Sequence, residues 1–153
     1  MADALVARWR LPRWERDGNA RATGGQIPAG RVHLMKPQTY MNLSGRVLRD
    51  LRAPSPEFQF TDLLILVDDF ALPLGSYRLR TTGSAGGHNG LKSVEEALGT
   101  KNYPRLRIGI GPKPAGADQS DWVTDQMPAD DRKVVDALMP EMCDVVEKWV
   151  SGQ

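Results

Sequence analysis

The chain has 153 residues, of which 41% are hydrophobic and 25% are charged, and its formal net charge is +1. This composition is typical of a soluble globular protein, and the length predicts one domain spanning residues 1–153. No apolar segment approaches the roughly 20 residues that cross a bilayer, so a membrane partner is not expected. The single Cys143 excludes an internal disulfide and a cysteine-based metal site, which favours a reducing, cytoplasmic location.

The first half of the chain alternates between helical and strand patterns. Residues 2–10 have the apolar spacing of an amphipathic helix, and residues 30–36 are typical of a strand that ends before a proline. Apolar side chains at helical spacing follow over residues 43–51. The continuous apolar run at residues 63–67 predicts a central strand buried on both faces, ending at the Asp68–Asp69 pair.

The second half of the chain continues this alternation. Residues 76–81 predict a strand with one solvated face, residues 90–99 a helix, and residues 105–110 another strand. Residues 134–149 have the spacing of a long amphipathic helix, which Pro140 should kink or divide. Strands that alternate with helices predict an α/β sandwich with a largely parallel or mixed sheet.

A glycine-rich segment lies between a predicted strand and a predicted helix. Residues 83–90 contain four glycines and also His88 and Asn89. Glycine permits positive φ and a close approach of the backbone to a ligand, and a helix N-terminus favours anions or developing negative charge. We interpret the segment as a ligand-binding loop; the alternative is a solvated glycine-rich turn.

Charge is distributed unevenly along the chain. Residues 76–113, which contain this loop, carry seven basic and two acidic side chains, whereas residues 114–153 carry three basic and nine acidic ones. A basic segment beside a candidate site favours a polyanionic partner. The alternative is an ordinary solvated charged surface.

Polar side chains follow three predicted strands at the point where each strand ends. Asn42 follows the strand at 30–36, Asp68 ends the apolar strand, and Asn89 follows the strand at 76–81. Ligands of open α/β sheets gather at the carboxyl ends of strands, so we expect the three side chains to share a pocket. The alternative is that the two asparagines cap helices and that Asp68 lies in a turn. A metal site is not expected, because the other two clusters are rich in amides and poor in carboxylates.

These same segments resemble the motifs of bacterial-type peptidyl-tRNA hydrolases. The resemblance covers nearly the whole chain, and the motifs occur in the order typical of that family. They are Lys36-Pro37-Gln38-Thr39-Tyr40-Met41-Asn42-Leu43-Ser44-Gly45, Val67-Asp68-Asp69-Phe70-Ala71-Leu72-Pro73-Leu74-Gly75, Gly86-Gly87-His88-Asn89-Gly90-Leu91 and Arg105-Leu106-Arg107-Ile108-Gly109-Ile110-Gly111.

The resemblance implies an activity and a fold. The activity is hydrolysis of the ester that joins a peptide to the 3′ end of tRNA, without a metal or a cofactor. The fold is a three-layer α/β/α globule around a twisted, mixed and mostly parallel sheet. The implied partner is peptidyl-tRNA or the tRNA acceptor end.

The resemblance also implies roles for individual residues. Asn42 positions the peptide or a catalytic water, Asp68 orients the catalytic base, and Asn89 contacts substrate and water. The remaining assignments concern binding: the cleft is lined by Tyr40, Met41, Gly87 and His88, and tRNA phosphates are met by Arg80 and Arg107.

One part of the family pattern has no match in these residues. The family begins with a strand and a Thr-Arg-His-Asn segment that supplies the general base, whereas the two histidines here are His33, within a predicted strand, and His88. We therefore expect a truncated domain with impaired catalysis and a gap where that strand would lie. The alternatives are a non-catalytic RNA-binding member of the family and a protein that pairs with another chain through the gap. Otherwise we expect a monomer.

Overall fold

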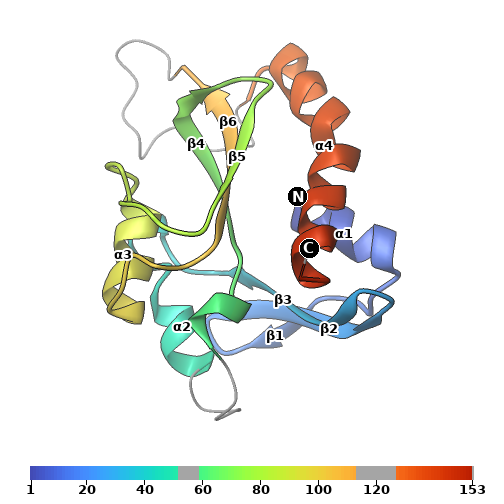
Figure 1. The fold of residues 1–153 in the computed structure, drawn as a ribbon, viewed down its shortest axis with the longest axis vertical. Coiled ribbons are helices and arrows are strands. Elements are labelled where there is room, and N and C mark those ends of the chain that lie inside the picture. The colour runs from blue at the N-terminus through green and yellow to red at the C-terminus, as the bar shows by residue number, and fades with distance from the viewer. Residues whose placement is uncertain (52–58, 113–126, 153) are drawn as a thin grey trace.

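The computed structural model describes residues 1–51, 59–112 and 127–152 (Figure 1). The helices in these ranges are α1 (Ala2–Trp9), α2 (Arg46–Leu51), α3 (Asn89–Leu98) and α4 (Ala129–Val150), with short 3₁₀ turns η1 (Met41–Leu43) and η2 (Phe60–Asp62). The strands are β1 (Glu15–Asp17), β2 (Ala20–Ile27), β3 (Gly30–Pro37), β4 (Ile65–Pro73), β5 (Tyr77–Arg80) and β6 (Arg105–Gly111). None of the helices described is long and apolar enough to span a membrane.

The described strands form two sheets of three strands each. One sheet has the order β1-β2-β3 and is antiparallel, whereas the other has the order β4-β6-β5 and is mixed. Strand β6 runs parallel to β4 and antiparallel to β5. The expected α/β class and mixed sheet are confirmed, but the expectation of a mostly parallel sheet is wrong for these strands. Short turns join β1 to β2 and β2 to β3, and such hairpin connections permit only antiparallel pairing.

Helices cover both faces of the β4-β6-β5 sheet. In Figure 1, α2 and α3 lie on one side of it, and α1 and α4 lie on the other. Alternate residues of β4 follow this division, since Ile65 and Val67 pack toward the α2 and α3 side and Leu66 packs toward α1 and α4. The three-layer α/β/α arrangement therefore follows from the two-residue period of a strand between two apolar layers.

Each side of the sheet has its own apolar core. On the α1 and α4 side the buried residues are Leu5, Leu106, Ile108, Met142, Cys143 and Val146. On the α2 and α3 side they are Leu48, Ala85, Leu91, Val94, Leu98 and Tyr103. The second core lies directly beneath the glycine-rich loop, and it therefore supports the segment that carries His88 and Asn89.

The hairpin formed by β1 and β2 was not predicted from the sequence. Gly24 and Gly25 interrupt β2 with residues of low strand propensity. The structure explains Gly24, because a Cβ there would lie 2.5 Å from the carbonyl oxygen of Val32 on β3. A close approach between two strands is a long-range requirement, which the local pattern does not reveal.

Strand β4 differs from its prediction in two respects. It continues through the Asp68–Asp69 pair to Pro73, because its ladder with β6 extends to that point. It also lies at an edge of its sheet, and residues 65–68 are only partly buried. The predicted central, fully buried strand is therefore wrong for the part of the chain that the structure describes.

Helix α4 is a single helix that contains Pro140 and is not divided by it. A proline removes one intrahelical hydrogen bond. The guanidinium of Arg8 on α1 donates to the carbonyl oxygen of Pro140 at 3.2 Å and also pairs with Asp144 and Glu147. These contacts join α1 to α4 across the proline.

We expect replacement of the fully buried Leu106 by alanine to lower the free energy of unfolding by about 2–5 kcal/mol, because a cavity would open in the core beside α4. Urea unfolding with an unchanged m-value would measure this loss. The matched control is Leu79→Ala on β5, whose side chain is 38% exposed; its effect should be within about 0.5 kcal/mol. Equal losses for the two variants would contradict the assignment of the core.

Candidate functional site

Three segments that are distant in the sequence adjoin beside β4, around the start of α3. The Nε2 atom of His88 lies 3.1 Å from the backbone carbonyl oxygen of Asp68, which joins the start of α3 to β4. A Cβ at Gly90 would lie 2.6 Å from the sulfur of Met41, so η1 packs directly on the first turn of α3. The segments that carry Asn42, Asp68 and Asn89 thus adjoin, and a pocket shared by the three side chains stays a prediction.

His88 is the N-cap residue of α3. Its Nδ1 accepts a hydrogen bond from the Leu91 N–H at 3.2 Å, which assigns the ring proton to Nε2, the atom facing the Asp68 carbonyl. Both ring nitrogens are therefore engaged within the protein. The imidazole fastens α3 to β4, and neither nitrogen is free to take a proton from a substrate.

The alternative interpretation of the two asparagines as helix caps is wrong. The N-cap of α3 is His88, and Asn89 is the first residue within the helix, where its side chain is exposed. Asn42 lies in the middle of η1, whose N-cap is Tyr40, and it is also exposed. Both amides are therefore available to a ligand.

The two aspartates at the end of the apolar run have different surroundings. Asp69 is buried, and its carboxylate accepts from the Ala71 N–H at 2.9 Å and pairs with the Arg107 guanidinium at 3.3 Å. Asp68 is only partly buried, and within the described residues no hydrogen bond or ion pair reaches its carboxylate. Consecutive strand residues point to opposite faces, so the pair does not form one ligand set.

Tyr40 and Met41 give the site an exposed apolar border. The side chain of Tyr40 is 82% exposed and that of Met41 is 54% exposed, although both are large hydrophobic groups. Gly87 lies next to His88 with φ +85, a conformation that a larger residue rarely adopts. An apolar border beside two free amides is suited to a ligand with both apolar and polar parts.

The position of η1 relative to α3 is set by a close contact. The N–H of Gly45 donates to Ser93 Oγ at 2.9 Å, and a Cβ at Gly45 would lie 2.1 Å from the carbonyl oxygen of Ser93. Glycine is thus needed at position 45 for α2 and η1 to approach α3. The contact determines how Asn42 lies relative to Asn89, and the sequence analysis did not identify Ser93 as part of the site.

A fully buried arginine holds the glycine-rich loop against β6. The guanidinium of Arg105 donates to four backbone carbonyls, at distances from 2.6 to 3.5 Å: those of Gly83, Ser84, Lys101 and Tyr103. It also lies 3.7 Å from the carboxylate of Glu95 on α3 and 3.8 Å from the centroid of the Tyr103 ring. One cation therefore links β6, α3 and the loop that leads to His88.

Burial also affects the phenol of Tyr103, the aromatic partner of this cation. Desolvation raises the pKa of the Tyr103 phenol to about 12, even though the charge of Arg105 acts in the opposite direction. The phenol therefore stays protonated near neutral pH. Its ring provides a neutral face for the guanidinium and adds no negative charge beside Glu95.

The two arginines expected to meet tRNA phosphates have different environments. Arg80 lies on β5 with an exposed side chain. Arg107 directs its guanidinium inward, to Asp69 and to the Ser84 carbonyl at 2.9 Å, and its side chain is 20% exposed. Arg80 is accessible to a polyanion, whereas Arg107 mainly braces the loop.

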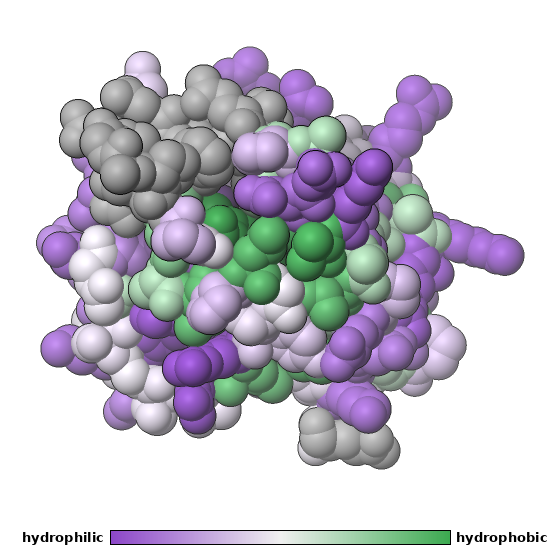
Figure 2. Space-filling view, turned by 90° about the horizontal axis from the view of Figure 1, so that it is seen from above, coloured by the Kyte–Doolittle hydropathy of each residue, from purple (hydrophilic) through white to green (hydrophobic). Residues whose placement is uncertain are grey.

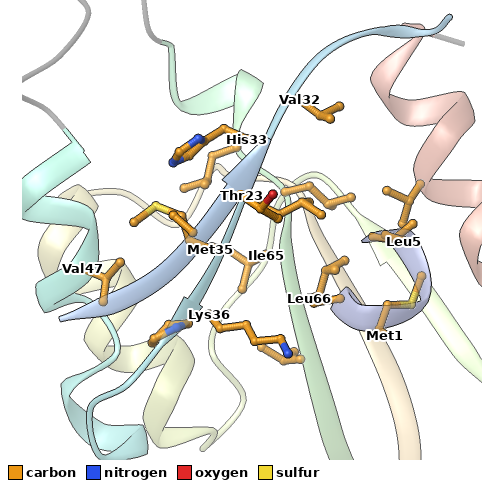
Figure 3. Close-up of a pocket in the computed structure, with 18 of the residues that line it drawn as sticks. Met1, Leu5, Thr23, Val32, His33, Met35, Lys36, Val47, Ile65 and Leu66 are labelled. Carbon is orange, nitrogen blue, oxygen red and sulfur yellow. The ribbon is translucent and has the colours of Figure 1, made fainter. Parts of the chain in front are cut away.

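A large cavity separates the two sheets. Its volume is about 2420 Å³, and β3 and β4 line it from opposite sides with residues that include His33, Met35, Ile65 and Leu66 (Figure 3). On the face shown in Figure 2, apolar side chains form a patch that polar side chains surround. The carboxyl-bearing residue Asp68 belongs to the cavity lining as well. The facing strands β3 and β4 are both edges of their sheets.

Comparison with known proteins identifies the family that the sequence motifs resemble. A family model described as peptidyl-tRNA hydrolase matches residues 1–153. The chain belongs to the peptidyl-tRNA hydrolase family. A relative from Gemmatimonas aurantiaca named peptidyl-tRNA hydrolase is 46% identical over 99% of this chain and 81% of its own length. Another with this name, from Chloroflexus aggregans, is 43% identical over 97% of this chain and 79% of its own length.

Solved structures support the same family. The crystal structure of peptidyl-tRNA hydrolase from Acinetobacter baumannii is similar to this chain, with a TM-score of 0.82 at 29% sequence identity. The similarity covers 99% of this chain and 77% of that one. The fold described above is therefore a peptidyl-tRNA hydrolase fold.

We expect replacement of Arg105 by methionine to lower the free energy of unfolding by about 3–5 kcal/mol, because Glu95, whose side chain is 14% exposed, would remain largely buried without its cation. Urea unfolding measures the loss, and amide hydrogen exchange should show faster exchange over residues 83–88. The matched control Arg80→Met removes an exposed arginine from the neighbouring strand and should change stability by no more than about 0.5 kcal/mol. Unchanged exchange in the loop of Arg105→Met would refute its bracing role.

Proposed function

We propose that this chain binds the acceptor end of peptidyl-tRNA and that its reaction is hydrolysis of the ester between peptide and tRNA. The observation that supports this most directly is the meeting of η1, the middle of β4 and the start of α3, which brings together the segments of Asn42, Asp68 and Asn89. Relatives named peptidyl-tRNA hydrolase over nearly the whole chain support the same reaction. The proposed setting is the cytoplasm, where translation takes place, and no cofactor is proposed.

The proposed roles follow from what each group offers. The exposed amides of Asn42 and Asn89 can each donate and accept a hydrogen bond, which suits the positioning of a peptide or a water molecule. Asn89 also opens α3, whose first N–H groups favour the negative charge that develops on an ester oxygen under attack. Tyr40 and Met41 provide an apolar wall, and Gly87 with His88 forms the floor between them and β4.

The proposed tRNA contacts use positive charge near this site. Arg80 presents an exposed guanidinium from β5, and a guanidinium binds phosphate oxygens through paired hydrogen bonds. Arg107 is proposed to contribute mainly charge, because its donors already serve Asp69 and Ser84. Phosphate contacts of this kind position the RNA without reading its sequence.

We further propose that a polypeptide of these 153 residues alone hydrolyses its substrate slowly. Ester hydrolysis needs a base to activate water, and a positioned general base contributes about 10²–10⁴-fold. Of the two histidines, His88 uses both ring nitrogens within the fold, and His33 lies on β3. The free carboxylate of Asp68 is suited to orient an imidazole, but neither histidine donates to it.

The cavity between the sheets suggests where a further strand would fit. Within the described ranges, strands β3 and β4 each have a partner strand on one side only, and both line this cavity together with many apolar side chains. The relatives from Gemmatimonas aurantiaca and Chloroflexus aggregans are longer, since this chain spans 81% and 79% of their lengths. We propose that an extended apolar strand fills this space in the longer proteins, and that without one the open edges favour self-association over a stable monomer.

A second candidate function is binding of RNA without cleavage. The observation that favours it is the engagement of both ring nitrogens of His88, which leaves the amides able to bind but gives no imidazole base at Asp68. The two candidates share the same ligand and the same surface. Turnover therefore separates them, whereas binding alone does not.

Replacement of Asn42 or Asn89 by alanine is expected to lower peptidyl-tRNA hydrolysis, or acceptor-end affinity where turnover is absent, at least tenfold. Stability should change by no more than about 0.5 kcal/mol, because both side chains are exposed and neither caps a helix. The measurements are single-turnover hydrolysis, binding of tRNA and urea unfolding. Asn102→Ala, an exposed asparagine beyond α3, is the matched control; an equal loss in that variant would argue against the site.

A chain extended before Met1 by an apolar strand and a Thr-Arg-His-Asn segment is expected to hydrolyse peptidyl-tRNA about 10²–10⁴ times faster than residues 1–153 alone. The same extension with alanine in place of its histidine isolates the base from the effect of filling the cavity. This control should improve stability and reduce self-association without restoring turnover. If the histidine-containing extension gave no gain, the proposal that a missing base limits this chain would be rejected.

A further inference from the structure

A row of basic side chains crosses the β1-β2-β3 sheet. Arg16 on β1 lies directly opposite Arg21 on β2, and Arg21 lies directly opposite Lys36 on β3. Residues opposite each other on antiparallel strands have Cα atoms about 4.5–5.5 Å apart and point to the same face. We call Arg16, Arg21 and Lys36 the basic row.

Lys36, the member of the basic row on β3, is neutralised within the protein. The Nζ atom of Lys36 lies 2.5 Å from the carboxylate of Asp3 on α1 and 4.5 Å from the centroid of the Trp14 ring. The hydrogen bond from Lys36 holds the pKa of the Asp3 carboxyl below its usual range. Asp3 Oδ1 also accepts from the indole N–H of Trp14 at 2.9 Å, so the same carboxylate oxygen contacts both Lys36 and Trp14.

The other two members of the basic row, Arg16 and Arg21, have no acidic partner among the described residues. Arg16 and Arg21 are both exposed, and within the described ranges no acidic side chain lies within ion-pairing distance of either. Like charges directly opposite each other destabilise a sheet. Glu15 and Asp17 flank Arg16 along β1, but strand alternation directs them to the other face. The sheet thus presents two adjacent, uncompensated guanidinium groups.

The basic row is close in the chain to the candidate site. Strand β3 passes from Lys36 through Pro37 into the segment that carries Tyr40 and Asn42. The N–H of Gln38 donates to the carbonyl oxygen of Asn19 at 2.8 Å, which ties the β1–β2 turn to this connection. The basic row therefore lies at the end of its sheet from which the chain continues into the site.

We propose that Arg16 and Arg21 bind backbone phosphates of the tRNA whose acceptor end occupies the candidate site. This inference rests on the proposed function and names a second contact region for the same ligand. Two adjacent guanidinium groups suit phosphate, because each offers a planar pair of donors that matches phosphate oxygens. The contact is independent of sequence, since phosphates carry no base information.

The test compares tRNA binding by the unaltered chain and by the double variant Arg16→Gln/Arg21→Gln, measured between 50 and 200 mM salt. Loss of two phosphate contacts should lower the slope of log affinity against log salt concentration by about 1.4–1.8, and should weaken binding most at low salt. The charge-matched control is Arg31→Gln/Arg132→Gln, which removes two exposed arginines outside the row. The control should leave the slope nearly unchanged.

The possible results separate this inference from the proposed function. If the unaltered chain binds tRNA and Arg16→Gln/Arg21→Gln keeps the full salt slope, the basic row is not a tRNA contact, and the proposed function stands. An equal loss of slope in both double variants means that only overall charge matters, which also overturns the inference. If the unaltered chain does not bind tRNA, both proposals fail. Urea unfolding should show the row variant as stable as the unaltered chain or more so, because it relieves a like-charge pair.

Discussion

The guanidinium of Arg105 connects more of this structure than any other single group described here. It is fully buried and donates to four carbonyls, two of them in the glycine-rich loop, while it faces Glu95 on α3. A buried charge is tolerated only when it is paired and hydrogen-bonded. The loop and the helix must therefore stay where the cation needs them, and this requirement places His88 beside Asp68 of β4.

The arrangement of His88 links the fold to the chemistry. Its ring joins the first turn of α3 to the carbonyl of Asp68 in β4, so that the start of the helix is held against the strand. The same hydrogen bonds leave neither nitrogen free for proton transfer. Histidine is often a general base, but here its ring holds α3 against β4. The exposed amides of Asn42 and Asn89 are available to the ligand.

The two sheets have complementary roles around the cavity between them. The β4-β6-β5 sheet, braced by helices on both faces, supports the residues of the candidate site. The antiparallel β1-β2-β3 sheet leads into Tyr40 and Asn42 and carries the basic row at that same end. Among the described strands, β3 and β4 border this largely apolar space as sheet edges, and an edge without a partner costs stability because backbone groups and hydrophobic surface remain exposed. A strand that filled it would join the two sheets.

The sequence by itself determined most elements and the family, because helical spacing, apolar runs and long motifs are local signals. Helix α3 and strand β6 could be predicted in this way, whereas a pocket shared by Asn42, Asp68 and Asn89 stays a prediction. Only the tertiary structure decided, for the residues it describes, that β4 lies at a sheet edge, that Asp69 is paired whereas the Asp68 carboxylate is not, and that Arg107 turns inward. These features depend on which distant segment lies opposite each residue. Pairing across a sheet is a long-range property, and a one-dimensional pattern does not contain it.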